Sequence, residues 1–312
     1  MNSGDLNIAL ASDNNYAQHV AVVAASILCN TKSKVHFHVL SDGISQPKIQ
    51  LIQQTIDNLG GQLSVYDLSS YQCFDNLFTS GHISKAAYFR LDIANILPSG
   101  INKVIYMDVD LLVLQDIAEL WKCDLQGKPL AAVPDYGIMA SKRLMKQKKQ
   151  VLGLSMDSLY FNSGVVVMDL KQWREHNYAE QVIRLAAGGN LPHHDQDALN
   201  RVFMDKWMPL PLKWNVIPPI FNLFSKILLR NDLRKNAISA RKNKAVLHYA
   251  GRYKPWEFES KDGFNEKYYY YLQKTAFADV KMPQLSKDMK GKSIARQLMR
   301  LCVADFWENI LG

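Results

Sequence analysis

Two aspartates at the end of an apolar run could hold a metal ion. Asp108 and Asp110 follow the run Lys103–Met107 in an Asp-x-Asp pattern. Side chains two residues apart on an extended strand point to the same side, so both carboxylates can face one cation. Hard oxygen ligands suit Mn²⁺ or Mg²⁺ and leave coordination positions open for phosphate oxygens. The pattern alone is weak, because Asp195 and Asp197 repeat it and a pair of acids can simply cap a turn.

Two further segments carry groups that could complete such a site. Arg90 is the only charged residue in the apolar run Ala87–Leu91, which the pattern predicts to be helical. Such an arginine either extends to the surface or pairs with a carboxylate or phosphate through its planar guanidinium. His248 follows a short apolar stretch and precedes Gly251 and Lys254. A lone histidine after a strand is more often structural, but with the aspartates it would form an Asp/Asp/His site for a diphosphate-bound ion.

The elements that must position these residues alternate between strand and helix. The first part of the chain predicts strands at Leu6–Ala11, Val35–Leu40 and Leu63–Tyr66, with helices at Tyr16–Asn30 and Pro47–Leu59. This order predicts an α/β fold with a mostly parallel sheet that is covered on both faces. Ligands of such sheets bind beyond the carboxyl ends of the strands, so we expect the chemistry after Ala11, Tyr106 and Val133.

The second part of the chain continues the pattern less regularly. It predicts strands at Lys103–Met107, Leu130–Val133, Val165–Met168 and 245–249, and helices at Lys171–Ala187 and from His193 to about Met204. The stretch Met208–Pro219 contains four prolines and is expected to be irregular.

Composition excludes several classes of protein. The 312 residues are 48% hydrophobic and 21% charged, which is typical of a globular protein and not of a disordered one. The net charge of +8 comes from residues 226–312, so a uniformly basic nucleic-acid binder is disfavoured and no nucleic-acid partner is expected. Four scattered cysteines argue against a structural zinc site and favour a reducing compartment. Without a signal peptide or a membrane-spanning run, a cytoplasmic location is expected.

The last residues differ from the rest of the chain. Residues 281–312 predict a basic helix with apolar residues at helical spacing and an aromatic end at Phe306 and Trp307. Such a helix is a candidate for peripheral contact with an anionic membrane. A helix packed on the parent domain, with its lysines in solvent, is an equally good interpretation.

Seven short motifs in order carry a resemblance to a known family. They lie at Ala11–Tyr16, His82–Ser84, Tyr88–Leu91, Tyr106–Asp110, Phe161–Val165, Asp195–Asp197 and His248–Trp256. In this order and spacing the chain resembles glycosyltransferase family 8, the retaining nucleotide-sugar transferases, and within it the bacterial lipopolysaccharide galactosyl- and glucosyltransferases. The resemblance covers about residues 6–256. It implies a single Rossmann-like, GT-A type domain over residues 1–280 with a mixed, mostly parallel sheet, followed by the basic extension 281–312.

The resemblance also implies roles for individual residues. Asp108, Asp110 and His248 would hold Mn²⁺, or Mg²⁺, against the diphosphate of a UDP-sugar. The donor nucleotide and sugar would contact Asp13, Asn15, Tyr16, Arg90, Val109, Asn162, Gly251 and Lys254. The reaction itself would involve Asp135, Asp195 and Gln196, and His82 would lie on the acceptor side. The family motif often has a second acid after Asp13, where this chain has Asn14.

The chemistry of the transfer agrees with these roles. Breaking the anomeric bond leaves negative charge on the diphosphate, which a divalent ion and Lys254 would stabilise. Retention by double displacement needs a carboxylate beneath the anomeric carbon, whereas a glutamine such as Gln196 is a poor nucleophile. We therefore favour a front-face reaction in which the departing phosphate oxygen helps to deprotonate the acceptor, with Asp197 or Asp135 as nucleophiles in the covalent alternative.

The expected function is transfer of a hexose, galactose slightly before glucose, from a UDP-sugar to a lipopolysaccharide or lipooligosaccharide acceptor. One alternative is a UDP-sugar transferase that acts on a polysaccharide or protein. Another is a catalytically silent stress protein that binds a nucleotide sugar. A dehydrogenase and an NTPase are disfavoured, because neither G-x-G-x-x-G after the first strand nor G-x-x-x-x-G-K-S/T is present.

Overall fold

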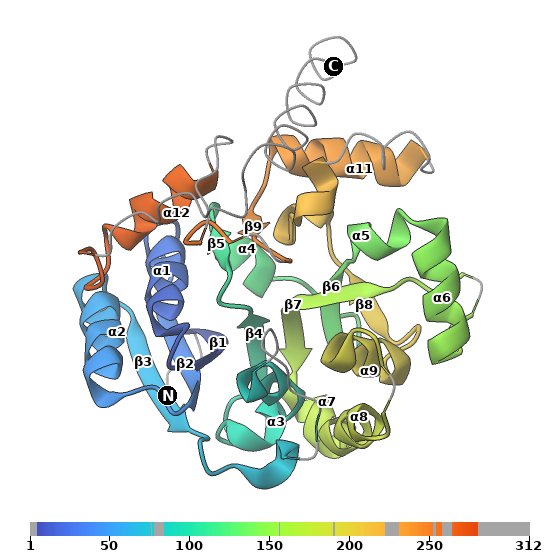
Figure 1. The fold of residues 1–312 in the computed structure, drawn as a ribbon, viewed down its shortest axis with the longest axis horizontal. Helices are drawn as coiled ribbons and strands as arrows, with labels where there is room; N and C mark the ends of the chain where they lie inside the picture. Colours follow the sequence, from blue (N-terminus) through green and yellow to red (C-terminus); the bar gives the residue numbers. More distant parts are fainter. Residues whose placement is uncertain are drawn as a thin grey trace.

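A seven-stranded mixed sheet forms the centre of the molecule (Figure 1). The computed structural model describes residues 5–75, 77, 84–155, 157–189, 191–221, 231–251, 254–257 and 264–279. The strand order is β3-β2-β1-β4-β7-β6-β8. The strands are β1 (Leu6–Asp13), β2 (Val35–Asp42), β3 (Gln62–Asp67), β4 (Lys103–Met107), β6 (Leu130–Pro134), β7 (Phe161–Asp169) and β8 (Trp207–Pro209). Only β7 runs antiparallel to its neighbours β4 and β6, which confirms the predicted mixed, mostly parallel sheet.

Alternation along the strands creates two hydrophobic cores, one on each face of the sheet. In β1, Ile8 and Leu10 belong to one core, whereas Ala9 and Ala11 belong to the other. Successive side chains of a strand point to opposite faces, so a strand buried on both faces is a continuous apolar run. This is why the sequence LNIALA predicts a central strand of an α/β sheet.

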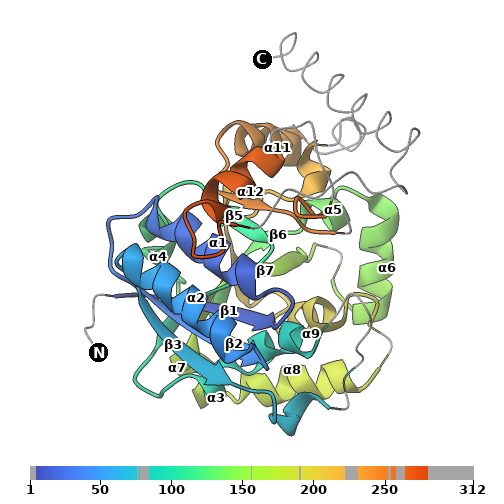
Figure 2. The same cartoon turned by 60° about the vertical axis from the view of Figure 1, so that its left-hand side comes forward.

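Helices cover both faces (Figures 1 and 2). One core includes buried residues of α1 (Ala17–Leu28), α2 (Gln46–Asn58), α4 (Ala118–Trp121), α5 (Tyr136–Met139), α11 (Asn231–Lys242) and α12 (Phe264–Leu272). The other includes residues of α3 (Ile93–Ile96), α7 (Leu170–Glu175), α8 (Tyr178–Ala187) and α9 (His194–Val202). Helix α6 (Lys142–Leu152) lies at the edge and contributes Leu152 to a small third cluster.

A second, two-stranded sheet brings a distant part of the chain to the end of β4. Strand β5 (Leu111–Val113) pairs antiparallel with β9 (Val246–His248), with Leu111 opposite His248. The turn Asp108–Asp110 between β4 and β5 therefore lies beside His248, although some 140 residues separate them along the chain.

Several sequence predictions about local structure need correction. The predicted helix Lys171–Ala187 is two helices, α7 and α8, because Asn177 adopts a left-handed conformation with φ of +51°. Asparagine tolerates that conformation better than most residues, so it ends α7 without a glycine. Arg90 lies in a 3-10 helix, Lys85–Leu91, and not in an α-helix.

The strand predicted at Val165–Met168 begins earlier, at Phe161, so that the Phe161–Gly164 motif is part of β7. The proline-rich stretch Met208–Pro219 is not wholly irregular, since it contributes to the edge strand β8 and contains the short 3-10 helix Leu212–Trp214. An edge strand tolerates proline because one side of it needs no ladder hydrogen bonds.

Two predictions lie outside the described residues. The basic extension 281–312, and with it the proposed domain boundary at residue 280, is not described, and neither is His82. Within the described part of the chain, no helix combines the length and the apolar character needed to cross a bilayer.

Candidate active site

The candidate site lies where the strand order reverses. The chain adds β2 and β3 on one side of β1 and then returns to place β4 on the other side. The crevice beyond the carboxyl ends of β1 and β4 is therefore the expected binding position for a ligand. Asp13 ends β1 and Asp108 follows β4, so these two predicted residues lie at that end of the sheet.

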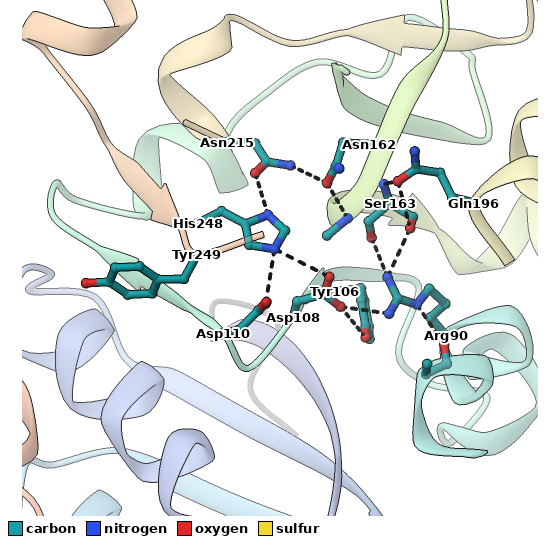
Figure 3. Close-up of polar contacts among 12 residues, drawn as sticks. Arg90, Tyr106, Asp108, Asp110, Asn162, Ser163, Gln196, Asn215, His248 and Tyr249 are labelled. Carbon is teal, nitrogen blue, oxygen red and sulfur yellow. Dashed lines mark hydrogen bonds and ion pairs between the residues drawn. The ribbon is translucent and has the colours of Figure 1, made fainter. Parts of the chain in front are cut away.

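Three potential metal ligands converge at the end of β4 (Figure 3). One ligand atom from each of Asp108, Asp110 and His248 lies within 4.8 Å of the others. His248 Nε2 is 3.0 Å from Asp110 Oδ1 and 3.8 Å from Asp108 Oδ2. The predicted Asp/Asp/His constellation thus exists as a geometric cluster, and its carboxylate oxygens suit Mn²⁺ or Mg²⁺.

Neighbouring hydrogen bonds fix the orientation of the His248 ring. The Gly164 N–H donates to Asn162 Oδ1 at 3.0 Å, which identifies that atom as the amide oxygen. Asn215 then donates its Nδ2 to the same oxygen at 2.8 Å and turns its own oxygen to His248 Nδ1, also at 2.8 Å. Nδ1 therefore carries a ring proton, and Nε2, which faces the two aspartates, is the nitrogen available to a metal ion.

Position 164, beside the cluster, has no room for a side chain. A Cβ added to Gly164 would overlap the His248 ring and lie 2.8 Å from Asp108 Oδ2. Glycine at this position of β7 is therefore needed for close approach of the cluster to the strand, and not for an unusual backbone conformation.

Lys254 supplies a positive charge to the cluster. Its ammonium forms an ion pair with Asp110 Oδ2 and donates to the Tyr249 carbonyl at 2.8 Å. Burial tends to raise the pKa of Asp110, but His248 and Lys254 outweigh it and hold the pKa below its ordinary value. The Asp110 carboxylate is thus charged, as a ligand of a divalent cation must be.

Arg90 joins the two Asp-x-Asp motifs. Its guanidinium is 2.8 Å from Asp108 Oδ1 and 3.2 Å from Asp195 Oδ2, and it donates to the Ser163 carbonyl at 3.0 Å. The side chain is buried and stacks over the Tyr106 ring, with 4.6 Å from Cζ to the ring centroid. Of the two interpretations of this arginine, pairing with carboxylates is confirmed and extension to the surface is wrong.

Amide and carboxyl groups meet on the other side of Arg90. Asp135 Oδ2 accepts hydrogen bonds from Asn162 Nδ2 and Gln196 Nε2, each at 3.1 Å. Asp135 Oδ1 caps α5 by accepting from the Ile138 N–H at 3.0 Å. Gln196 Oε1 accepts from the Ser163 N–H at 3.1 Å, so both ends of this amide are held. These groups form a polar, largely buried wall next to the cluster.

The loop after β1 forms the opposite wall. Asp13 Oδ1 accepts from the N–H groups of Asn15 and Tyr16 at 2.8 and 3.0 Å, which folds the loop back on itself. The Tyr16 ring stands edge-on to Trp256, with 5.9 Å between centroids. Asn14, which replaces the family's second acid, accepts from the Ser45 N–H at 3.0 Å and so anchors the loop to the start of α2.

Two of the predicted residues have no polar side chain. Val109 is partly buried against the hydrophobic core. Gly251 has a φ of +98°, and a Cβ there would meet no atom within 4 Å, so its backbone conformation is what requires glycine.

Sequence reasoning missed groups that the structure places in the same network. Asn215 orients His248, and the backbone N–H and carbonyl of Ser163 hold Gln196 and Arg90. Ser163 lies in the Phe161–Val165 motif. Asn215 lies in the proline-rich stretch, where no sequence pattern marked it as a site residue. It reaches the site because Val216 bridges to Leu247 beside His248, which only the fold reveals.

Fold and site together define a GT-A type glycosyltransferase. The sequence profile of glycosyl transferase family 8 matches residues 7–260, so the chain belongs to that family. It is 29% identical over 291 residues to general stress protein A of Bacillus subtilis, covering 90% of this chain and 98% of that protein. It is 28% identical to a lipopolysaccharide 1,2-glucosyltransferase of Escherichia coli K12, covering 80% of this chain and 72% of that protein.

A solved structure shares the fold across nearly its whole length. The galactosyltransferase LgtC, in complex with donor and acceptor sugar analogues, superposes with a TM-score of 0.77 at 25% sequence identity. The match covers 92% of this chain and 99% of that one. The predicted GT-A fold and the family are thereby confirmed.

Proposed function

We propose that the protein is a retaining glycosyltransferase that moves a hexose from a UDP-sugar to a sugar of a lipopolysaccharide or lipooligosaccharide. Galactose is slightly preferred over glucose as the donor sugar. The observation that carries the proposal is the convergence of Asp108, Asp110 and His248 beside the polar wall of Asp135 and Gln196. Membership of family 8 and the names of the lipopolysaccharide glucosyltransferase and LgtC support the donor and acceptor classes.

We assign the nucleotide to the crevice between the β1 loop and the cluster. Tyr16 offers a ring face for the uracil, and Asn15 and Asp13 hold the loop in shape. Burial and nearby carboxylates raise the pKa of Tyr16 to about 12, so its hydroxyl stays protonated and can donate to the nucleotide. Gly251 allows the backbone to approach the diphosphate closely.

The diphosphate is assigned to the cluster itself. Asp108, Asp110 and His248 would hold Mn²⁺ or Mg²⁺, which supplies positive charge to the leaving diphosphate when it is bound. Lys254 supplies a second positive charge from the same side. Its ammonium sits on Asp110 in the structure and can turn to a phosphate oxygen as negative charge develops there.

The donor sugar is assigned to the wall formed by Arg90, Asp135, Asn162, Asp195 and Gln196, which we call the sugar wall. Burial raises the pKa of Asp195 in spite of Arg90, which fits a group that hydrogen-bonds to sugar hydroxyls rather than one that attacks carbon. The Gln196 amide is a poor nucleophile, and both of its polar atoms are hydrogen-bonded. These features favour a front-face reaction, in which the departing phosphate oxygen takes the acceptor proton.

A donor screen tests the function directly. The full chain is incubated with UDP-galactose, UDP-glucose and other UDP-hexoses in the presence of Mn²⁺, and released UDP is measured. We expect one UDP-hexose, first UDP-galactose, to support release that rises when a lipopolysaccharide-core oligosaccharide is added and falls when the divalent ion is chelated. Anomeric configuration of the product then tests retention.

We further propose that the protein works in the cytoplasm at the inner face of the membrane, where residues 281–312 contact anionic lipid. Each basic residue near such a surface contributes about 1 kcal/mol, so several together suffice for peripheral binding. Deletion of residues 282–312 should leave turnover on a small acceptor intact and reduce co-sedimentation with anionic vesicles. A truncated protein that sediments like the full chain would refute this assignment.

A second candidate function is a silent nucleotide-sugar-binding stress protein. It is favoured by the similarity to general stress protein A, which extends over 98% of that protein. It predicts nucleotide binding without UDP release from any donor. A transferase that acts on a polysaccharide or protein is the remaining alternative, and it predicts UDP release that lipopolysaccharide-core sugars do not stimulate.

A further inference from the structure

Helix α6 carries a lysine that is buried, unlike its basic neighbours. Lys142, Arg143 and Lys146 on the same helix are exposed, whereas Lys148 is only 2% exposed. A buried ammonium is unfavourable unless it is paired and hydrogen-bonded, so its partners must compensate for the lost hydration. None of the roles assigned above to the site residues uses this lysine.

The partners of Lys148 are a fully buried carboxylate and a histidine. Its Nζ lies 2.6 Å from Asp197 Oδ1 and 2.7 Å from Oδ2, and 2.6 Å from His193 Nδ1. Burial, followed by the nearby Lys148, lowers the pKa of His193, so the ring stays neutral and its Nδ1 accepts from the ammonium. Lys148 lies on α6, whereas His193 precedes α9 directly and Asp197 lies in its first turn. The ion pair therefore connects the two helices.

The same carboxylate accepts two further hydrogen bonds. The Tyr160 hydroxyl donates to Asp197 Oδ1 at 2.6 Å, and the His193 N–H donates to Oδ2 at 2.8 Å. Burial, together with Asp197, raises the pKa of Tyr160, so its hydroxyl keeps its proton and donates. With Lys148 on both oxygens, Asp197 has no lone pair directed at the sugar wall. It therefore does not suit the role of a nucleophile in a covalent route.

The network continues from Tyr160 into the sugar wall. The Tyr160 hydroxyl oxygen accepts from Gln196 Nε2 at 3.2 Å, and the same Nε2 donates to Asp135 Oδ2 at 3.1 Å. A chain of hydrogen bonds therefore runs from Lys148 through Asp197 and Tyr160 to the Gln196 amide. Each link has a defined donor, because the Asp197 carboxylate only accepts, and the Lys148 ammonium holds that carboxylate in place.

We propose that Lys148 is a positioning residue for the transfer reaction: it fixes Asp197, which orients the Tyr160 hydroxyl and thereby aims the Gln196 amide at the donor sugar. The proposal rests on the proposed function, because it concerns the donor-sugar part of the same site. Lys148 itself does not touch the sugar. Lys148 instead affects the position of the anomeric carbon relative to its leaving group. Its loss should therefore lower turnover more than it weakens nucleotide binding.

The first test compares Lys148→Met with a matched control, Lys146→Met, which removes an exposed ammonium from the same helix. With the UDP-hexose that the donor screen selects, Lys148→Met should lower kcat by about 100-fold, the effect of misplacing a reacting group by roughly 1 Å. The affinity for UDP with Mn²⁺, measured by calorimetry, should stay within about twofold because the nucleotide crevice is untouched. Lys146→Met should match the wild type in both measurements.

Two further variants separate positioning from folding. Tyr160→Phe removes the hydroxyl link but leaves the ion pair, so it should lower kcat by at least about tenfold with little change in melting temperature. Lys148→Met combined with Asp197→Leu removes both buried charges, which should restore the melting temperature lost in the single variant. Turnover should not recover in this double variant, since Tyr160 has lost its acceptor.

The outcomes that would overturn the proposal are specific. An active wild type whose kcat is unchanged by both Lys148→Met and Tyr160→Phe would show that the network does not position the sugar. Recovery of kcat together with the melting temperature in the double variant would show that Lys148 acts through folding alone. A wild type that turns over no UDP-hexose would instead refute the proposed function, and calorimetry with UDP would still report whether the nucleotide crevice binds.

Discussion

The two halves of the candidate site differ in how far their hydrogen bonds are satisfied without a ligand. Around Asp110, the ammonium of Lys254 and the imidazole of His248 both contact one carboxylate, and His248 Nε2 faces the acids. Around Gln196, every polar atom of the amide has a protein partner with a defined direction. We call the half around Asp110 the exchangeable half, because its side chains can change partners when a ligand binds. We call the half around Gln196 the rigid half, because its hydrogen bonds are already complete.

This difference matches the roles that we propose for the two halves in a glycosyl transfer. The diphosphate gains charge during the reaction, so mobile positive groups that can shift toward it are useful there. The sugar must be held at a fixed angle to its leaving group, so a rigid wall is useful on that side. Arg90 lies between the two, with one carboxylate from each Asp-x-Asp motif on its guanidinium.

The largest effect is expected where the exchangeable half loses a ligand. Asp110→Asn should lower turnover by about 1,000-fold, because it removes a carboxylate ligand and leaves Lys254 and His248 without their shared anion. Turnover and Mn²⁺ affinity are measured together, with Asp57→Asn on the exposed face of α2 as the control. Full turnover in Asp110→Asn would remove the metal cluster from the mechanism.

A smaller effect is expected where the rigid strand β7 meets the cluster. Gly164→Ala adds a Cβ that would overlap the His248 ring, and such overpacking costs about 1–3 kcal/mol. We expect Mn²⁺ affinity to fall by roughly 10- to 100-fold, since every 1.4 kcal/mol is a factor of about ten.

The matched control is Gly100→Ala, where an added Cβ meets nothing within 4 Å. Melting temperatures of both variants show whether Gly164→Ala disturbs the whole sheet or only the cluster. Unchanged metal affinity in Gly164→Ala would mean that His248 is not a ligand, because the ring cannot stay in place beside the new methyl group.

The same contrast explains what could be predicted from the sequence. The exchangeable half consists of charged residues that stand out from apolar strands, such as Asp108, Asp110 and Lys254, and the order of strands and helices predicts where they meet. The rigid half depends on residues whose types are unremarkable in sequence. Asn215 and Lys148 gain their roles from contacts with residues 33 and 49 positions away, which no local pattern reports.

Local structure was predictable to the same degree. Strand positions followed from apolar runs, because a strand buried on both faces has few other ways to be built. The break between α7 and α8 was not, because Asn177 ends a helix through a backbone conformation that its sequence neighbours do not announce. The burial of Arg90 was one of two open interpretations, and only the positions of Asp108 and Asp195 decide between them.

The finest test of the contrast concerns Lys254, whose ammonium pairs with the Asp110 carboxylate that a divalent ion would also bind. If this half exchanges partners, Lys254→Met should tighten Mn²⁺ binding to the nucleotide-free protein and weaken UDP binding at saturating Mn²⁺. Each shift should be about tenfold, since a hydrogen bond to a charged group contributes roughly 1.5–3 kcal/mol. Both affinities are measured by calorimetry. The control is Lys267→Met, which removes an exposed lysine of α12 and so reports the effect of losing a positive charge elsewhere. Weaker Mn²⁺ binding in Lys254→Met would mean that the lysine supports the ion rather than competing with it, and the cluster would then be as preformed as the sugar wall.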